Sequence, residues 1–470
     1  GSAADLRPTH TGRRSARDPL GDAADFSAEH RLHTAIPSPP TAAQTALGAC
    51  VAVPVLSAES VQAAGERVRW LVDSSRAQGL SVSATNVGWG RDTSEALTSV
   101  QLAALSPHLS HVAQVHYRCL SSYPRRPRPT VPPVHRSLPA LFWHRWVLPV
   151  DDTHVGFEQI RLALSVGVVI AAGRLRLEDA CACLGMATTP KAASRALQAL
   201  GARPDWAATT DMLTRVADTL AEHPAPIDYE RRRRLPMGDL LPESSWHDIC
   251  RRLGLRPGRV VKHRLIRCWL YERIAGSPGR MFLHAIDTGP FRAMLADLPR
   301  TLYPELVSAL DAAARRFLDD QDLGHEPLRW SPPQDAAPAW TSRRPLNEAI
   351  DVGKLHELVQ PRDSRLGAVT ARLGASIDSV REALNDAPAP PPTLTLAQRR
   401  ATGAVMVGAR AQLTPEVLAD LYVRQRLTLK AIGETVGVSK QTIGRLAREY
   451  GIPLRPSAVS SRRHALGTDE

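Results

Sequence analysis

The chain has 470 residues, 43% of them hydrophobic, which is enough for about three domains with buried cores. Its formal net charge of +12 favours a polyanionic partner, either nucleic acid or an anionic membrane surface. The sequence predicts no membrane span, because its most apolar run, VGFEQIRLALSVGVVIAAG, contains Glu158 and Arg161 and is interpreted as a buried helix.

The six cysteines are scattered along the chain and never form a C-x-x-C pair. A zinc ribbon needs two such pairs, because each close pair supplies one edge of the metal tetrahedron. We therefore predict no metal, no cofactor and no disulfide framework. The expected location is the cytoplasm, in association with the nucleoid.

The first part of the chain predicts a tail followed by a small domain. Residues 1–48 are rich in Pro, Ala, Ser, Thr, Arg and Asp without periodicity, and we expect them to be disordered. Residues 49–120 predict a small mixed domain of unknown role, in which ESVQAAGERVRWLVDSSRAQG is a helix and the alternating LSVSATNV is a short strand. Residues 121–138 are basic and Pro-rich. They are interpreted as a linker, with a phosphate-binding strip as the alternative.

For the whole chain we predict a mainly α protein with a small N-terminal domain that is the candidate α/β part. After that domain, Pro-rich linkers are expected to join several helix-turn-helix units. The expected segments are a helical domain with two such units (139–330), a linker (331–345), a third unit (346–386), a Pro-rich spacer (387–395), a C-terminal helix-turn-helix (396–456) and a basic tail (457–470).

A spacing pattern around glycine supports the repeat. A small helix-turn-helix needs apolar residues eight and five places before the turn glycine, a small residue four places before it, and apolar residues on either side of it. The glycine adopts a left-handed conformation that other residues enter at a cost of roughly 1 kcal/mol. In the last unit these positions are Leu429, Ile432, Gly433, Val436, Gly437 and Val438, followed by the N-cap Ser439 and the buried Ile443 and Leu446.

The first half of the pattern recurs around three more glycines. Around Gly374 we expect an N-cap at Ser376 and a buried Val380. Around Gly254 we expect Pro257 at the first helical position and a buried Val260. Around Gly185 the turn is longer and ends at Thr189 and Pro190. Cys181 and Cys250 occupy the small-residue position, so they are interpreted as buried side chains and not as ligands. The alternative for all these units is helical hairpins packed for structure alone.

The second helix of the last unit is the candidate recognition helix. Residues near the N-terminus of such a helix reach base edges in the major groove, where Gln pairs with adenine and Arg or Lys with guanine. The predicted contacts are Ser439, Lys440, Gln441, Thr442, Arg445 and Arg448, and Arg455 begins a basic arm whose alternative interpretation is a solvated tail.

The Gly254 unit has a still more basic second helix. Its predicted contacts are Arg256, Arg259, Lys262, His263, Arg264 and Arg267, and the run Arg231, Arg232, Arg233 and Arg234 lies upstream. Such runs are often solvated faces, but their position beside a candidate reading helix favours phosphate contact. In the Gly374 unit, Asp378 and Glu382 would repel phosphates, which predicts a structural or protein-contacting copy. Whether the Gly185 unit contacts DNA is left open.

Two stretches resemble known families. LTLKAIGETVGVSKQTIGRLAREYGIPLRP resembles the helix-turn-helix modules of Hin-type site-specific recombinases and related transposon proteins. SLPALFWHRW, PIDYERRRRLP and WHDICRRLGLRPGRVVKHRLIRCWLYERIAGSP are similar to the helical C-terminal regions of actinobacterial TniQ/TnsD-type proteins. That resemblance implies target selection in transposition, with DNA bound through serial helix-turn-helix units and other transposition proteins recruited. The zinc-ribbon cysteines of that family are absent here, so the resemblance does not extend to that module.

The leading hypothesis is a non-enzymatic, sequence-specific protein whose partners are double-stranded DNA and transposition or transcription proteins. A transcriptional regulator is the nearest alternative. A recombinase or transposase with a catalytic domain in residues 50–330 is another, but its candidate carboxylates show no sign of converging: Asp151, Asp152, Glu158, Glu178 and Asp179. A third hypothesis is an interaction scaffold that docks partners through residues 50–120.

Overall fold

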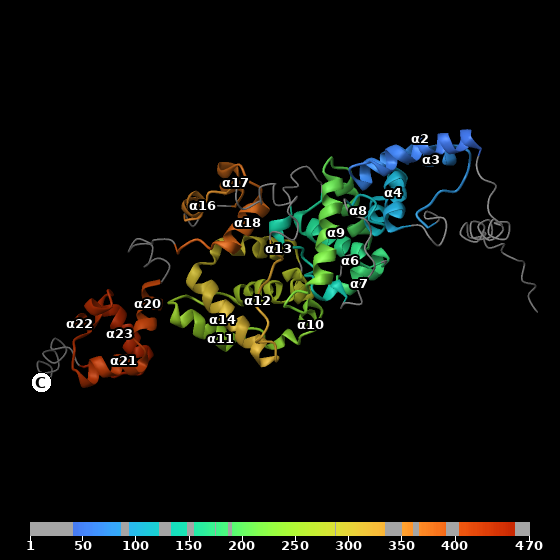
Figure 1. Cartoon of the computed structure of the whole chain (residues 1–470). Coiled ribbons are helices and arrows are strands. Elements are labelled where there is room, and N and C mark those ends of the chain that lie inside the picture. Colours follow the sequence, from blue (N-terminus) through green and yellow to red (C-terminus); the bar gives the residue numbers. More distant parts are fainter. Residues whose placement is uncertain are drawn as a thin grey trace, which may run out of the picture. The chain divides into compact units, whose positions relative to one another are not determined.

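The computed structural model describes residues 41–85, 94–121, 133–147, 155–173, 175–186, 190–286, 288–333, 350–360, 366–391 and 404–455. These residues form helices and connecting turns, without a strand, which confirms the mainly α prediction (Figure 1). The strand expected in LSVSATNV is not formed over residues 80–85, and its last two residues lie outside the described part. A strand needs a neighbour for its backbone groups, and the described elements around it are helices.

The chain divides into two compact units. Unit 1 holds described residues 41–146 and 155–230, with 331–333; unit 2 holds residues 147, 231–330 and 350–455. The helices of unit 1 are α2 (Ala42–Leu56), α3 (Val61–Ala77), α4 (Glu95–Leu105), α5 (His111–His116), α6 (Phe157–Ala172), α7 (Leu177–Cys183), α8 (Pro190–Gly201) and α9 (Trp206–Glu222). The short α10 (Tyr229–Arg233) begins at the end of unit 1 and ends in unit 2.

Unit 2 contains three groups of helices. The first is α11 (Glu243–Arg252), α12 (Val260–Ala275), α13 (Gly289–Asp297) and α14 (Pro304–Asp320), with the 3₁₀ segments η5 (Gly279–Ile286) and η6 (Leu298–Thr301). The second is α16 (Val352–Val359), α17 (Leu366–Leu373) and α18 (Ile377–Asp386). The third is α20 (Ala404–Gln412), α21 (Pro415–Ala419), the π-helix η8 (Asp420–Arg424), α22 (Leu429–Thr435) and α23 (Lys440–Glu449).

The core of unit 1 is built around α6. From Leu162 to Ala171 every residue of this helix is buried, as the sequence predicts, and α8 and α9 pack against it. The end of the expected N-terminal domain joins the same core. There the indole of Trp206 donates a 2.6 Å hydrogen bond to Gln114, and Arg118 donates to the carbonyl of Ala171.

The observed division therefore differs from the predicted domains. The described residues of the predicted 49–120 domain fall in the same unit as the helices up to Glu230, while the predicted helical domain 139–330 is divided between the two units at Glu230 and Arg231. Buried polar groups need partners, and the carbonyl oxygen of the Gln114 side chain finds its partner in Trp206, 92 residues away, which the local pattern does not reveal. Within the part of the chain that the structure describes, every helix is too short or too polar to cross a membrane.

Candidate nucleic-acid interface

The four turns predicted from the glycine spacing share one backbone geometry. The glycines all have left-handed φ values: 62° at Gly185, 64° at Gly254, 64° at Gly374 and 67° at Gly437. In each turn the backbone N–H of the residue after the glycine donates to the carbonyl of the residue four places before the glycine. The pairs are Met186 to Cys181 (3.2 Å), Leu255 to Cys250 (2.7 Å), Ala375 to Thr370 (3.3 Å) and Val438 to Gly433 (2.7 Å). This is the Schellman ending of a helix, so the repeat is confirmed at the level of the turn.

The segment after the turn differs between the units. In the Gly437 and Gly374 units, Ser439 and Ser376 cap the second helix by accepting from the backbone N–H of Thr442 (3.2 Å) and Ser379 (3.1 Å). Both serines are the predicted N-caps, and the helices they cap, α23 and α18, begin in the same register after the glycine.

The other two units have longer turns. In the Gly254 unit α12 begins at Val260, so Pro257 lies in the turn and not at the first helical position. Val260 is 59% exposed, and its predicted burial is wrong. Val260 is the first residue of α12 and faces solvent, whereas Lys262 and His263 in the same turn lie against Trp246 of α11. In the Gly185 unit α8 begins at Pro190, and the predicted cap Thr189 lies outside the described residues.

The small-residue position has the predicted packing role. A Cβ added at Gly433 would lie 2.5 Å from the carbonyl oxygen of Val438, so a larger residue forces the turn to shift. Cys181 and Cys250, at the same position, are buried as expected. Burial raises the pKa of each thiol to about 11, so both are neutral at physiological pH.

Helix α23 buries one face and exposes the predicted reading face. Ile443 and Leu446 are fully buried beneath it. Lys440, Gln441, Arg445 and Arg448 are exposed. Ser439 and Thr442 share a 3.0 Å hydroxyl–hydroxyl contact at the cap, where Ser439 is exposed and Thr442 is partly buried. Between Val436 and Arg448 the sequence contains no Asp or Glu, so the exposed face is positively charged.

Helix α18 has the same local structure as α23, but its outward side chains contact other parts of unit 2. Its Arg381 is held by Asp378 (2.7 Å) and by the carbonyl of Ala296 (2.7 Å). Its Asn385 accepts a 3.1 Å hydrogen bond from the indole of Trp269. Much of the outward face of α18 is therefore occupied by contacts within unit 2, in keeping with the structural-copy interpretation.

Arg455 is engaged with its own unit. Its guanidinium lies 4.4 Å from the centre of the Tyr422 ring and donates to the carbonyls of Arg426 (3.2 Å) and Leu427. These carbonyls follow the π-helix, where backbone acceptors lack helical partners. In this arrangement Arg455 fastens the segment after α23 to the rest of its unit, and we do not include it among the proposed DNA contacts.

The six basic residues predicted in the Gly254 unit separate into two groups. Arg256, Arg259 and Arg264 are exposed. Lys262 and His263 lie against Trp246, with the ammonium 5.7 Å from the indole centre and the imidazole stacked on it at 6.4 Å. Burial lowers the pKa of Lys262.

The inward group anchors α12. The imidazole of His263 lies 2.8 Å from the carbonyl of Leu241, and Arg267 donates to the carbonyls of Leu240 (2.8 Å) and Met237 (2.9 Å). Lys262, His263 and Arg267, the inward-facing side of α12, therefore fix this helix to α11 and to the segment before it. The exposed arginines surround the start of α12 at Val260 and Val261, which we call its tip. Trp246, which the sequence marks only as an apolar position, contacts two of these three side chains, Lys262 and His263.

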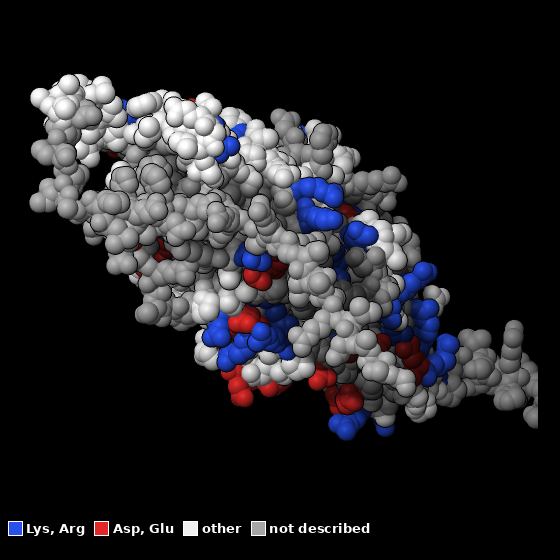
Figure 2. Space-filling view, turned by 90° about the vertical axis from the view of Figure 1, so that its right-hand side faces the viewer, with Lys and Arg blue, Asp and Glu red and all other residues white. Residues whose placement is uncertain are grey.

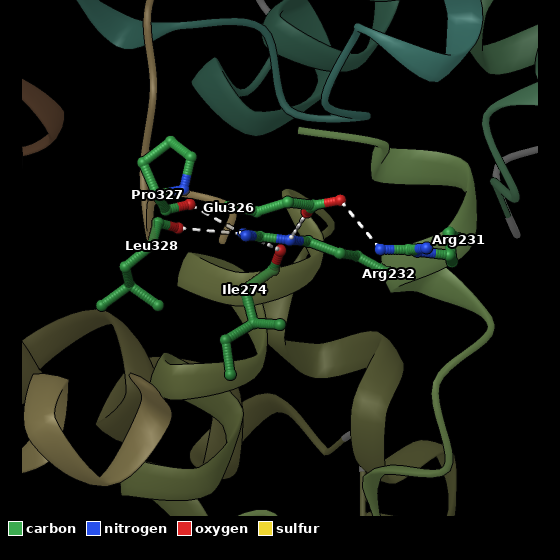
Figure 3. Close-up of polar contacts among 6 residues, drawn as sticks. All are labelled: Arg231, Arg232, Ile274, Glu326, Pro327 and Leu328. Carbon is green, nitrogen blue, oxygen red and sulfur yellow. Dashed lines mark hydrogen bonds and ion pairs between the residues drawn. The ribbon is translucent and has the colours of Figure 1, made fainter. Parts of the chain in front are cut away.

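The run Arg231 to Arg234 does not form one basic surface. Arg232 has no exposed side-chain area, which contradicts its predicted phosphate contact. It pairs with Glu326 at 2.8 Å and donates to the carbonyls of Ile274 (3.3 Å), Leu328 (3.1 Å) and Pro327 (2.8 Å) (Figure 3).

The other arginines of the run lie nearer the surface. Arg231 pairs with the second oxygen of Glu326 at 3.2 Å, its side chain 49% exposed, while Arg233 is half-buried and Arg234 exposed. The partner that draws Arg232 inward lies far along the chain, and nothing in the local sequence marks Glu326 as that partner.

The surface charge is not uniform. Figure 2 shows a face on which Lys and Arg side chains gather in separate groups, with Asp and Glu side chains among them. Among the described residues, no cluster of His, Cys, Asp or Glu is suited to holding a metal ion, and the candidate carboxylates Asp151 and Asp152 lie outside them. No protein-family model, curated protein or solved structure matches this chain.

Proposed function

We propose that this protein binds double-stranded DNA in a sequence-dependent manner, with α23 as the main reading helix. The observation that carries the proposal is the exposed face of α23. It presents Lys440, Gln441 and Arg445 on a helix whose opposite face is fixed by Ile443 and Leu446. An α-helix fits the major groove, where Gln pairs with adenine and Lys or Arg with guanine.

A second contact is supported at the tip of α12. Arg256, Arg259 and Arg264 are exposed, and residues 253–271 contain no Asp or Glu. Each phosphate that such residues neutralise steepens the dependence of affinity on salt by about 0.9 in log–log slope. Two contacts in one chain also raise affinity through effective concentration. We therefore expect a binding site longer than one helix-turn-helix covers.

The cellular role that we propose is site selection for a mobile element. The support for it is the resemblance of residues 427–456 to recombinase and transposon helix-turn-helix modules. A gene position beside a transposase gene would favour this role over transcriptional regulation. Association with the nucleoid would follow from DNA binding.

The test begins with selection of bound fragments from genomic DNA by the full chain. The enriched sequence is then measured with wild type and with the triple variant Lys440→Ala, Gln441→Ala and Arg445→Ala. Each lost base contact is expected to reduce discrimination against a scrambled duplex by about 1–3 kcal/mol. Because all three side chains are exposed, the fold should be retained.

A matched control removes the same positive charge elsewhere. Arg372 and Arg424 are exposed residues of unit 2 outside α23 and α12, so Arg372→Ala with Arg424→Ala lowers the net charge as the triple variant does. The control should keep the discrimination. If the triple variant distinguishes the selected duplex from the scrambled one as well as wild type does, α23 is not the reading helix. If no fragments are enriched and no duplex is bound, the proposed function is wrong.

A further inference from the structure

The tip of α12 presents two apolar side chains to solvent. Val260 is 59% exposed and Val261 is 37% exposed. From Leu265 to Ala275 the same helix buries all its hydrophobic side chains, so its apolar surface has a core part and a separate tip. The two adjacent valines therefore form a small apolar site at the start of α12, separate from the core.

Positive charge surrounds these valines. Arg259 immediately precedes them, Arg264 follows one helical turn later, and Arg256 lies in the turn before; all three are exposed. The matching partner is therefore anionic at its edges and apolar at its centre. The major groove of DNA offers such contacts where thymine is present, because two rows of phosphates flank the base pairs and each thymine adds an apolar 5-methyl group to the otherwise polar base edges.

We infer that Val260 and Val261 contact thymine 5-methyl groups in the major groove while Arg256, Arg259 and Arg264 contact the flanking phosphates. The inference rests on the proposed DNA-binding function and adds a base preference to it. It gives the Gly254 unit a reading role that depends on apolar contact and not on hydrogen bonds to base edges.

The inward-facing side of α12 is fixed in a way that suits this role. The indole of Trp246 donates a 3.2 Å hydrogen bond to the carbonyl of Pro257 and lies against Lys262 and His263. Arg267 is held by carbonyls of the segment before α11. The turn and the start of α12 are thus positioned before any partner arrives, which lowers the ordering cost of binding.

The experiment compares two short duplexes, one of alternating dA and dT and one of alternating dA and dU. They have the same charge and the same hydrogen-bonding groups and differ in the 5-methyl groups. Wild-type full-length protein should bind the thymine duplex about fourfold more tightly for each methyl group covered, from about 0.8 kcal/mol per buried CH₂. The double variant Val260→Ala and Val261→Ala should lose this preference and keep its affinity for the uracil duplex.

Two further variants make the comparison decisive. Val417→Ala with Val423→Ala removes valines of similar exposure, 42% and 54%, elsewhere in unit 2, and should keep the thymine preference. Val260→Thr with Val261→Thr retains the side-chain shape and should weaken the preference in part. Binding to neither duplex would also overturn this inference, whereas the proposed function is refuted only if the selection enriches no genomic fragment. Equal binding of both duplexes by wild type, or a preference that survives the alanine substitutions, would overturn this inference alone.

Discussion

Replacing Arg232 by methionine should destabilise unit 2 strongly, although a surface arginine in the same run would be replaced at little cost. The carboxylate of Glu326 is 5% exposed, and its closest partner is Arg232 at 2.8 Å. The substitution leaves this charge with the more exposed Arg231 and removes the Arg232 donors from the carbonyls of Ile274, Leu328 and Pro327. Breaking a buried ion pair by removing one partner costs about 3–5 kcal/mol.

The ion pair also predicts how the effects of the two single substitutions on the free energy of unfolding would combine. In the double variant Arg232→Met with Glu326→Met neither buried charge remains, so the two substitutions should be non-additive, with a coupling of up to about 3 kcal/mol. Arg424→Met serves as the control, because its pair with Asp420 at 3.4 Å is exposed on both sides and should contribute less than about 1 kcal/mol.

Hydrogen exchange followed by mass spectrometry suits this prediction. Two compact units need not unfold together, whereas exchange reports the opening of each segment separately. Peptides covering the end of α12 and residues 322–330 should exchange much faster in Arg232→Met. Exchange in these peptides no faster than in the Arg424→Met control would show that the pair does not hold the segments together.

Two further predictions concern packing and pH. Gly433→Ala should lower the free energy of unfolding of the C-terminal unit by about 1–3 kcal/mol, because its Cβ would meet the Val438 carbonyl oxygen at 2.5 Å. By contrast, Gly444→Ala, whose Cβ makes ordinary contacts, should raise the free energy of unfolding by up to about 1 kcal/mol. Thermal melts in which both substitutions shift the melting temperature in the same direction would contradict the close approach of Gly433 to the Val438 carbonyl. Burial raises the pKa of Cys250 to about 11 and of Cys268 to about 12, from 9.0, so the unfolded state loses these protons first. The stability that these thiols contribute is therefore fully present below pH 9 and falls as the pH rises toward 12, by up to about 1.4 kcal/mol per pH unit and thiol. In denaturant melts, the free energy of unfolding of Cys250→Ala with Cys268→Ala should decline less steeply with pH than that of wild type.

The features that could be predicted from the sequence are local ones. Gly437 adopts its left-handed turn, and Ser439 caps α23, through groups only a few residues away. The same holds for the turn at Gly374 and its cap at Ser376. Because such interactions close within one or two helical turns, spacing and residue type are enough to identify them.

The sequence by itself therefore determined a helical chain, four helix ends at left-handed glycines, and the positions of two helix caps. The tertiary structure decided which basic side chains face solvent: Arg232 turns inward because Glu326 meets it from 94 residues away. Likewise α18 is covered by groups 85 and 116 residues distant, whereas α23, in the same local register, keeps Lys440 and Arg445 exposed. Burial depends on which remote segments pack together, and a one-dimensional pattern of charges does not encode that.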